Sequence, residues 1–464
     1  MRTTLERELK LDPPEEFELP ELPGEPLEAR VFTSTYYDTP TRSLARAGIT
    51  IRRRVENGLS RWQLKLPRAG TARAELEAGG GPAGPPVELS ALLAAHLRHG
   101  PLEPVATLRT RRAGVRVLDR AIPLADVTLD LVDVLDGAHA AGRFAELEIE
   151  LVEGGEEDLE RLGRMLRRAG ARTANGTSKL LRVLPLPDPA AADDPTTLGR
   201  IKALLLAQLQ QLEAHDPGVR LGADPEDVHK FRVATRRARA IARATKPLLG
   251  DALQPLAAEL QWIADVLGPV RDLDVLVDHL RDEAAELAED RIAGDLLVET
   301  LEQERRVLRD VLLEALESER YFELLATFEQ AVALLPPLDA LDGLRPVAER
   351  ELRRLAKRAR KLPDVPSDDE LHALRIRAKR ARYSAELAEV STKYVDALKA
   401  VQDVLGAHQD AATAEARLRK VSRAKVAIAA GRLIERERAS RRAARAAYPE
   451  ALASALALGR RAFD

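Results

Sequence analysis

Near its start the chain alternates charged residues with apolar ones, a spacing that could assemble a site for a charged ligand. The segment Glu6-x-Glu8-x-Lys10 places two carboxylates and one ammonium on the same face of a strand. Residues 146–150 repeat the pattern with three glutamates. Clustered carboxylates repel one another unless a cation lies among them, and hard oxygen ligands suit Mg²⁺ or Mn²⁺. The pattern therefore predicts a metal-binding sheet face.

Basic residues follow the same alternation. Arg52 and Arg54 are two residues apart, as are Arg109 and Arg111, so each pair would lie on one face of a strand. Lys65 lies between two leucines. Arginine offers phosphate a bidentate fork and lysine a point charge. Carboxylates and cations that face one another across a sheet closed into a barrel indicate a triphosphate or polyphosphate-ester site. A solvated sheet face is the alternative.

A second basic pattern lies in the other half of the chain. Residues 228–247 contain seven Lys or Arg and no acid. On a helix, one stripe of about 100° of arc contains His229, Arg232, Arg236, Arg239, Arg243 and Lys246. The offsets recur in His372, Arg375, Lys379 and Arg382. Like charges at i,i+4 destabilise a helix, so two acid-free stripes favour an anion ligand over a solvated face.

The elements that must position these residues differ between the two halves. Alternating patterns predict strands at 6–11, 49–55, 61–66, 73–77, 127–134 and 144–152, and helical patterns lie at 87–98 and 156–169. From residue 196 the pattern is helical throughout, with breaks expected at several prolines, which include Pro217, Pro247 and Pro269.

A Pro-, Ala- and Asp-rich segment separates the halves and predicts a semi-rigid linker at 186–195. We therefore expect an N-terminal domain at 1–185 and a helical domain at 196–464. The helical part repeats itself, because the pair His229 and Gly268 recurs as His372 and Gly406. This repeat predicts two similar bundles related by a pseudo-twofold axis.

Composition narrows the class of protein. The 464 residues carry 72 Lys and Arg against 75 Asp and Glu, a net charge of -3. With 45% hydrophobic residues the chain can form a sizeable core. The absence of cysteine excludes disulfides and thiolate chemistry, and no apolar run predicts a membrane span or secretory signal. We expect a cytoplasmic protein that makes no membrane contact.

The N-terminal motifs form an ordered series that resembles the CYTH, or triphosphate tunnel metalloenzyme, family. The matching pieces are Glu6-x-Glu8-x-Lys10, Tyr36-Tyr37-Asp38-Thr39-Pro40, Ile51-Arg52-Arg53-Arg54, Gln63-Leu64-Lys65, Arg73-Ala74-Glu75, Phe144-Ala145-Glu146-Leu147-Glu148 and Ser178-Lys179. The resemblance implies an α+β domain built on an eight-stranded antiparallel β-barrel whose tunnel binds triphosphate.

By motif position the resemblance also assigns roles. The implied ligands of Mg²⁺ or Mn²⁺ are Glu6, Glu8, Asp130, Glu146 and Glu148. The implied phosphate-binding residues are Lys10, Arg52, Arg54, Lys65, Arg109, Arg111 and Lys179. Glu8 and Glu148 are the candidates to orient the attacking water, and no Ser-His-Asp arrangement or Walker motif competes.

The helical half is similar to the CHAD, or conserved-histidine α-helical, family. The matching pieces are 229–237, 267–272, 372–380 with Tyr383, and Leu405-Gly406. The resemblance implies an all-α pair of four-helix bundles that binds inorganic polyphosphate, through His229, Arg232, Arg236, Arg239, Arg243, His372, Arg375, Lys379 and Arg382. Gln409-Asp410 departs from Arg271-Asp272 in the first repeat.

These observations lead to one preferred hypothesis and several alternatives. The preferred one is a metal-dependent triphosphatase, acting most simply on inorganic triphosphate, coupled to a module that binds long-chain polyphosphate and associates with polyphosphate granules. A non-catalytic polyphosphate-binding protein is one alternative. An enzyme acting on a nucleoside or thiamine triphosphate, or making cyclic AMP, is another. The basic stripes lack interleaved aromatics, which disfavours nucleic acid.

Overall fold

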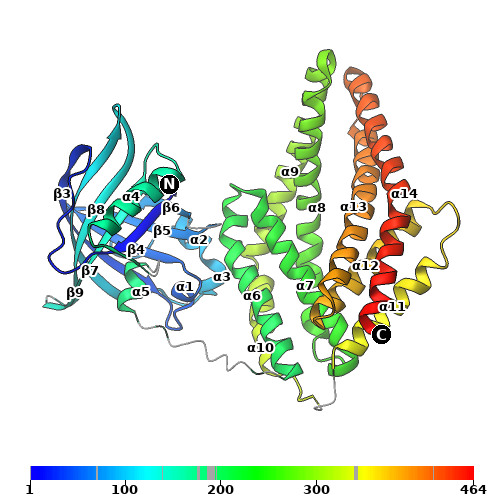
Figure 1. Ribbon diagram of the computed structural model, residues 1–464, viewed down its shortest axis with the longest axis horizontal. Coiled ribbons are helices and arrows are strands. Elements are labelled where there is room, and N and C mark those ends of the chain that lie inside the picture. Colours follow the sequence, from blue (N-terminus) through cyan, green and yellow to red (C-terminus); the bar gives the residue numbers. More distant parts are fainter. Residues whose placement is uncertain are drawn as a thin grey trace. The chain divides into compact units, whose positions relative to one another are not determined.

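The computed structural model describes residues 2–68, 72–137, 139–174, 178–184, 186, 194, 196–338, 343–421 and 423–464. The chain divides into two compact units, Met1–Ala190 and Ala191–Asp464 (Figure 1). Of the expected linker at 186–195, residues 187–193 and 195 lie outside the described residues. Among the described helices, none combines the length and the apolar character needed to cross a membrane.

The N-terminal unit is built on one antiparallel sheet. Its described strands are β1 (Arg2–Glu6), β2 (Glu8–Asp12), β3 (Gly24–Asp38), β4 (Thr50–Glu56), β5 (Leu59–Pro67), β6 (Arg73–Gly79), β7 (Glu103–Asp119), β8 (Ile122–Asp136), β9 (His139–Leu151) and β10 (Arg172–Thr173). Their order is β1-β6-β5-β4-β3-β7-β8-β9-β2-β10. The long strands β3 and β7 were not predicted, because their charged residues lie on both faces and hide the alternation.

The prediction of a closed eight-stranded barrel is wrong in detail. The described sheet has ten strands and its hydrogen-bond ladder is not closed. The expected strand at 6–11 is divided at Arg7, so that β1 pairs with β6 while β2 pairs with β9. Arg7 alone separates β1 from β2, and its carbonyl accepts a hydrogen bond of 3.0 Å from the Leu151 amide. One chain segment therefore connects the first strand of the sheet with the second-to-last one.

An apolar core on the outer face of the sheet fixes which side chains point inward. Leu147 and Ile149 of β9 are fully buried in a cluster that includes Leu159 and Leu162 of α4 (Glu156–Arg168). Because side chains alternate along a strand, Glu146, Glu148 and Glu150 then face the opposite side. The remaining described helices of this unit are short: α1 (Ser43–Arg46), α2 (Val87–Leu92), α3 (Ala94–Leu97) and α5 (Lys179–Val183).

The second unit is helical in all of its described elements. Its α-helices are α6 (Thr197–Leu221), α7 (Pro225–Leu249), α8 (Gln254–Ala285), α9 (Arg291–Glu317), α10 (Glu319–Ala333), α11 (Arg345–Ala359), α12 (Asp368–Leu387), α13 (Thr392–Val421) and α14 (Ala427–Phe463). Pro217, Pro247 and Pro269 lie inside helices, so the breaks expected there are wrong. Burial of the surrounding apolar face outweighs the one hydrogen bond that each proline removes.

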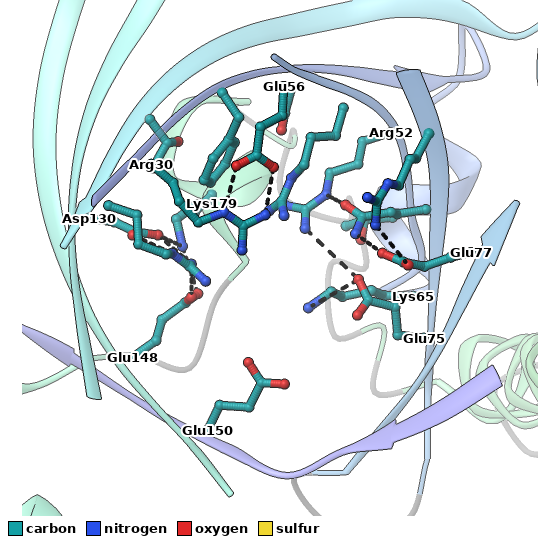
Figure 2. A pocket seen from close by; sticks show the side chains of 18 of the residues that line it. Arg30, Arg52, Glu56, Lys65, Glu75, Glu77, Asp130, Glu148, Glu150 and Lys179 are labelled. Carbon is teal, nitrogen blue, oxygen red and sulfur yellow. Dashed lines mark hydrogen bonds and ion pairs between the residues drawn. The ribbon is translucent and has the colours of Figure 1, made fainter. Parts of the chain in front are cut away.

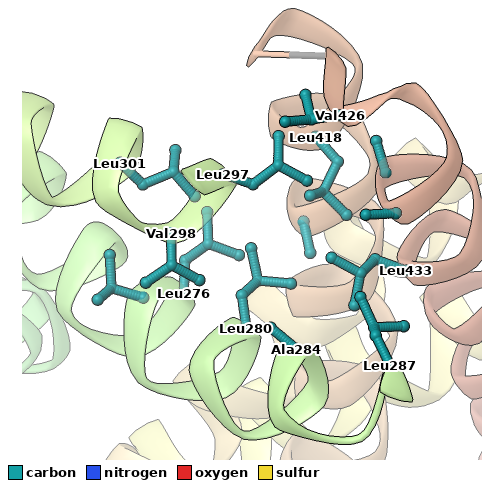
Figure 3. Packing of buried hydrophobic residues seen from close by; sticks show 14 of the residues in the cluster. Leu276, Leu280, Ala284, Leu287, Leu297, Val298, Leu301, Leu418, Val426 and Leu433 are labelled. Atoms are coloured by element: carbon teal, nitrogen blue, oxygen red, sulfur yellow. The ribbon is translucent and has the colours of Figure 1, made fainter. Parts of the chain in front are cut away.

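Two long hairpins pack against each other in this unit. Helices α8 and α9 form one hairpin and α13 and α14 form the other, with leucines and alanines of all four in one core (Figure 3). Several ion pairs cross between the hairpins, and two of them involve equivalent positions of the repeat. His279 of α8 meets Glu437 of α14 at 2.7 Å, and Arg417 of α13 meets Glu304 of α9, also at 2.7 Å. His279 and Arg417 thus occupy equivalent positions in the two repeats.

Candidate functional site

The sheet encloses a cavity of about 570 Å³ whose wall is formed by charged side chains. Each strand from β1 to β9 contributes to this wall. The contributions, in strand order, are Glu6, Lys10, Arg30, Arg52, Lys65, Glu75, Arg112, Asp130 and Glu148. Figure 2 shows carboxylates and cations gathered around the space. The sheet therefore brings together, in one cavity, charges that lie far apart in the sequence.

A tight turn sets the register of the cations on β4 and β5. Asn57 and Gly58 have positive φ angles of 49° and 76°, as a two-residue hairpin turn of the I′ type requires. The resulting register pairs Arg52 with Gln63 and Thr50 with Lys65. All four of these side chains line the cavity.

One side of the cavity holds carboxylates that are neutralised by lysine and arginine. Glu148 accepts hydrogen bonds from Lys10 at 2.8 Å and Lys179 at 2.6 Å, and another from Arg112. Asp130, fully buried, pairs with Lys179 at 3.0 Å and Arg112 at 2.6 Å. Burial alone would raise the pKa of Glu148, but these cations hold it well below its ordinary value.

The lysines of this network are held charged in return. Burial opposes the charge on Lys10, but Glu148, Glu8 and Glu146 together raise its pKa. Lys179, at the start of α5, also donates to Glu146 at 2.6 Å. Ser178 caps α5 by accepting a bond from the Leu181 amide, which fixes the position of the helix.

The other side of the cavity has an excess of carboxylates. Burial, and then Glu6, raise the pKa of Glu150 to about 7, and no described cation forms an ion pair with Glu150. Burial also raises the pKa of Glu6, which Lys65 opposes and Glu75 reinforces. The buried Glu75 Oε1 accepts no hydrogen bond from any described residue, but forms longer ion pairs with Lys65 at 3.8 Å and Arg52 at 3.9 Å. Figure 2 shows Glu150 standing apart from the paired groups.

Arg54 lacks a carboxylate partner among the described residues. Its guanidinium carbon lies 3.9 Å from the centre of the Phe32 ring, and its buried Nε has no described acceptor. Burial, and then repulsion from Arg52 and Arg112, lower the pKa of Arg54 to about 9. Arg52, by contrast, donates to Gln63 at 2.8 Å and to the Tyr36 hydroxyl at 3.0 Å. The Arg54 guanidinium is therefore available to bind an anion.

The structure does not place Arg109 and Arg111 in the cavity. Both are exposed on β7, and the inward position belongs to Arg112, which the sequence interpretation missed. Val115 and Val117 of β7 pack in the outer core beneath α4, and odd-numbered residues of the strand share that face. Those two valines were the signal that could have identified Arg112.

Most of the other residues predicted for this site do meet there. Glu6, Glu8, Lys10, Arg52, Arg54, Lys65, Asp130, Glu148 and Lys179 line the cavity. Glu146 is 1% exposed and bonds to Lys10 and Lys179 behind the wall. Sequence reasoning also missed Arg30 and Glu56 at the rim, which form a two-pronged ion pair.

The predicted metal-ligand set is not assembled as a metal site. In the described part of the chain, no three or more Asp, Glu or His side chains are arranged to hold a metal ion. Lys10, Lys179 and Arg112 occupy the space among Asp130, Glu146 and Glu148 instead. The acid-rich side fits a divalent cation better, because its glutamates repel one another and Glu150 has no described cation partner.

The basic stripes of the second unit meet where α7 contacts α12. Asp224 and Pro225 start α7, and the Ser367–Glu370 capping box starts α12. A cavity of about 570 Å³ lies between α7, α11 and α12. Its basic lining residues are Arg236, Arg239, Arg243, Lys246, Arg350, Arg354, Lys379 and Arg380. Sequence reasoning did not identify the contribution of α11.

The remaining residues of the two stripes lie outside the lining of this cavity. Arg232 pairs with Asp272 at 3.3 Å, and Arg382 pairs with Glu386 at 3.3 Å. His372 Nδ1 lies 2.9 Å from Gln409 Oε1. For His229, burial and then Arg271 lower the pKa of the imidazole.

The repeated glycines lie near two of these arginines. A Cβ atom at Gly406 would lie 3.3 Å from Arg375 Nη2, and one at Gly268 would lie 3.9 Å from Arg232 Nη2. A Cβ atom at Gly406 would therefore crowd Arg375, whereas 3.9 Å at Gly268 is an ordinary van der Waals distance. Of the two glycines, only Gly406 has a packing reason to lack a side chain.

Comparison with known protein families assigns a domain family to each half of the chain. Residues 4–181 match the CYTH domain, and residues 203–419 match the CHAD domain. The chain therefore belongs to the proteins in which a CYTH domain precedes a CHAD domain. CYTH domains are metalloenzymes that bind divalent cations.

Particular relatives match most of the chain or its helical part. Uncharacterized protein Rv2226 of Mycobacterium tuberculosis is 34% identical over 418 residues, covering 81% of this chain and 79% of that protein. The structure of PptA from Streptomyces chartreusis matches 55% of this chain and 99% of its own, at 22% identity and a TM-score of 0.47. The CHAD domain from the plant Ricinus communis matches 56% of this chain and 91% of its own, at 25% identity and a TM-score of 0.48.

Proposed function

We propose that the CYTH domain hydrolyses an inorganic triphosphate with the help of a divalent cation, and that the CHAD domain binds long-chain polyphosphate. One observation carries the first part: a single cavity holds a cation without a described carboxylate partner, Arg54, and a carboxylate without a described cation partner, Glu150. An anionic substrate accompanied by a metal ion would satisfy both sides at once.

The cavity supports an inorganic substrate over a nucleotide. Its aromatic rings are Phe32 and Tyr36. Arg54 stacks on Phe32 at 3.9 Å, and Arg52 lies 5.8 Å from the Tyr36 ring. Phe32 and Tyr36 are only 4% and 3% exposed, so neither ring offers an open face to stack on a base. We expect Arg52, Arg54 and Lys65 to hold phosphate oxygens.

The glutamates of the acid-rich side, Glu6, Glu8, Glu75 and Glu150, would hold the cation. When bound, Mg²⁺ or Mn²⁺ supplies charge neutralisation to the transferring phosphoryl group. The network of Lys10, Lys179 and Arg112 fixes the neighbouring Glu148 as an anion. Glu8 keeps only a 3.5 Å ion pair with Lys10, so it is the freer of the two candidates to orient water.

A phosphate-release assay on the full chain tests the enzyme proposal. We expect release from inorganic triphosphate with Mg²⁺ or Mn²⁺, and little from ATP, thiamine triphosphate or long-chain polyphosphate. Glu8→Gln should lower the rate at least about 100-fold, in the range for losing one charge-stabilising group. Glu153→Gln, at an exposed position just beyond β9, should leave the rate unchanged.

A non-catalytic polyphosphate-binding protein is the second candidate. In this candidate Lys10, Lys179 and Arg112 are the anion-binding groups, and carboxylates of the protein occupy them while no ligand is bound. The ion pairs that these cations form with carboxylates favour it. Binding of triphosphate without turnover under any divalent cation would support this candidate and contradict the first. Cytoplasmic location and association with polyphosphate granules stay predictions.

A further inference from the structure

Four cations from two equivalent helices converge where α7 meets α12. Arg232 and Arg236 come from α7, and Arg375 and Lys379 come from α12. The three arginines all act electrostatically on Lys379, and Arg236 and Lys379 line the same cavity. We refer to these four residues as the junction cations.

Acidic residues only partly neutralise the junction cations. Asp272 of α8 pairs with Arg232 at 3.3 Å, and Asp410 of α13 interacts with Arg375 and Lys379. On α11, Glu351 lines the cavity but pairs with Arg354 of its own helix. Nearby on α12, Arg382 is paired with Glu386. Three arginine charges, and that of Lys379 when it is protonated, therefore face two carboxylates, and the surplus calls for an anion.

The buried polar atoms of the junction independently indicate a missing ligand. The Nε atoms of Arg236 and Arg375 are buried and find no acceptor among the described residues. The Tyr383 hydroxyl, on the wall of the same cavity, is also buried and interacts with Arg236. Buried donors normally have acceptors, so these groups point toward an oxygen-rich anion.

Lys379 differs chemically from the other three junction cations. Arginine stays protonated in proteins, whereas lysine can lose its proton when it is buried. Burial, and then repulsion from Arg375, Arg236 and Arg232, lower the pKa of Lys379 to about 7. Asp410 opposes this shift but does not cancel it. The equivalent position in the first repeat is Arg236, which keeps its charge.

We propose that Lys379 takes up a proton when a polyphosphate chain occupies the junction between α7 and α12, so that polyphosphate binding is coupled to pH. The inference rests on the proposed polyphosphate binding by this domain. The Nζ lone pair accepts the proton from solvent, and the bound phosphates hold the resulting ammonium. Binding therefore strengthens as pH falls through neutrality, by at most about tenfold per pH unit for one proton.

Titration calorimetry on the full chain tests this inference. Long-chain polyphosphate is titrated near neutral pH in two buffers that differ in ionisation enthalpy, and the dependence of the observed heat on that enthalpy gives the protons taken up. We expect net uptake in the wild type and a clear reduction in Lys379→Arg, which keeps the charge. Lys379→Met should bind more weakly than Lys379→Arg at low pH, because it lacks the cation.

A second lysine of the same cavity provides the matched control. Lys246 is more than half exposed and pairs with Asp251 at 2.7 Å. Lys246→Arg should keep the proton uptake of the wild type. Equal uptake in the wild type and Lys379→Arg would overturn the inference, since titrating groups of the polyphosphate itself would then account for it.

The outcomes also separate this inference from the proposed function. Absence of polyphosphate binding by the wild type at every pH would overturn both. Tight binding without proton uptake at Lys379 would overturn only the inference. Circular dichroism of Lys379→Arg and Lys379→Met shows that each variant is folded, so that a change in uptake is assigned to the side chain.

Discussion

The two charged cavities of the molecule hold their cations in opposite ways. In the sheet cavity, Lys10 is buried among glutamates that raise its pKa, whereas in the helical cavity Lys379 is buried among arginines that lower its pKa to about 7. Burial acts against the charge in both places, so the neighbours decide the direction. A basic residue therefore indicates a ligand-binding site only when the residues around it are known.

This difference between the two cavities also distinguishes charged residues that stabilise the fold from charged residues that bind a ligand. A cation that already neutralises a buried carboxylate holds the fold together, as Arg112 does for Asp130. A buried cation without such a partner costs stability and is retained for another purpose, as with Arg54. The predictions below test this distinction in order of expected effect.

The largest effect is expected for Arg112→Ala. Removing Arg112 leaves the fully buried Asp130 with Lys179 as its remaining partner and weakens the network on Glu148, which should cost about 3–5 kcal/mol of unfolding free energy. Urea unfolding followed by Trp62 fluorescence, in a Trp262→Phe background, measures the N-terminal unit. Arg111→Ala is the control: its exposed pair with Asp133 should contribute about 1 kcal/mol or less. Equal losses in the two variants would contradict the assignment of Arg112.

We expect an intermediate effect for Arg54→Gln. This substitution should weaken substrate binding and should not lower the stability of the fold. Losing a charged hydrogen bond of about 1.5–3 kcal/mol should raise the KM for triphosphate roughly 10- to 100-fold. The unfolding free energy should stay the same or increase, because burial and two arginines oppose this charge. Steady-state kinetics and the same Trp62 assay check both parts. Lost stability with an unchanged KM would identify Arg54 as structural.

The smallest effect is expected at the ion pairs between the two hairpins. The hydrogen bond to Glu437 raises the pKa of His279, so this pair stabilises the fold below about pH 6.5 and loses its contribution as pH rises through the folded pKa. His279 is partly exposed, so the contribution should be about 1 kcal/mol or less.

Thermal melting of the helical circular dichroism signal at acidic and at mildly alkaline pH measures this effect. His279→Gln should lower the melting temperature only at the acidic pH. Arg417→Gln removes the equivalent pair with Glu304 and should act equally at both pH values, because arginine does not titrate there. A pH-independent effect of His279→Gln would argue against the histidine pair.

The inward carboxylates could be predicted from the sequence because their strand alternates cleanly. Leu147 and Ile149 fix the outer face of β9, so Glu146 and Glu148 must face inward. On β7 the arginines at 109, 111 and 112 break the alternation, and only Val115 and Val117 reveal the parity. A local pattern thus predicts a site residue where one face is uniformly apolar, and fails where both faces are charged.

The partners of the charged residues could not be predicted from the sequence. The Lys179–Glu148 contact joins residues 31 positions apart, and Lys10–Glu148 joins residues 138 apart. Such contacts depend on the order of the strands, which pairs β2 with β9 across the full length of the unit. Similarly, the helical breaks expected at Pro217 and Pro269 ignored the stabilisation that tertiary packing gives to an interrupted helix.

The division of the first strand at Arg7 has a consequence for how the molecule is made. Residues 2–12 are synthesised before their partners, because β1 pairs with β6, which ends at Gly79, and β2 pairs with β9, which ends at Leu151. During synthesis β1 can therefore pair once β6 has emerged, whereas β2 stays unpaired until β9 has emerged. Assembly of the CYTH cavity is then a late event in the synthesis of this domain.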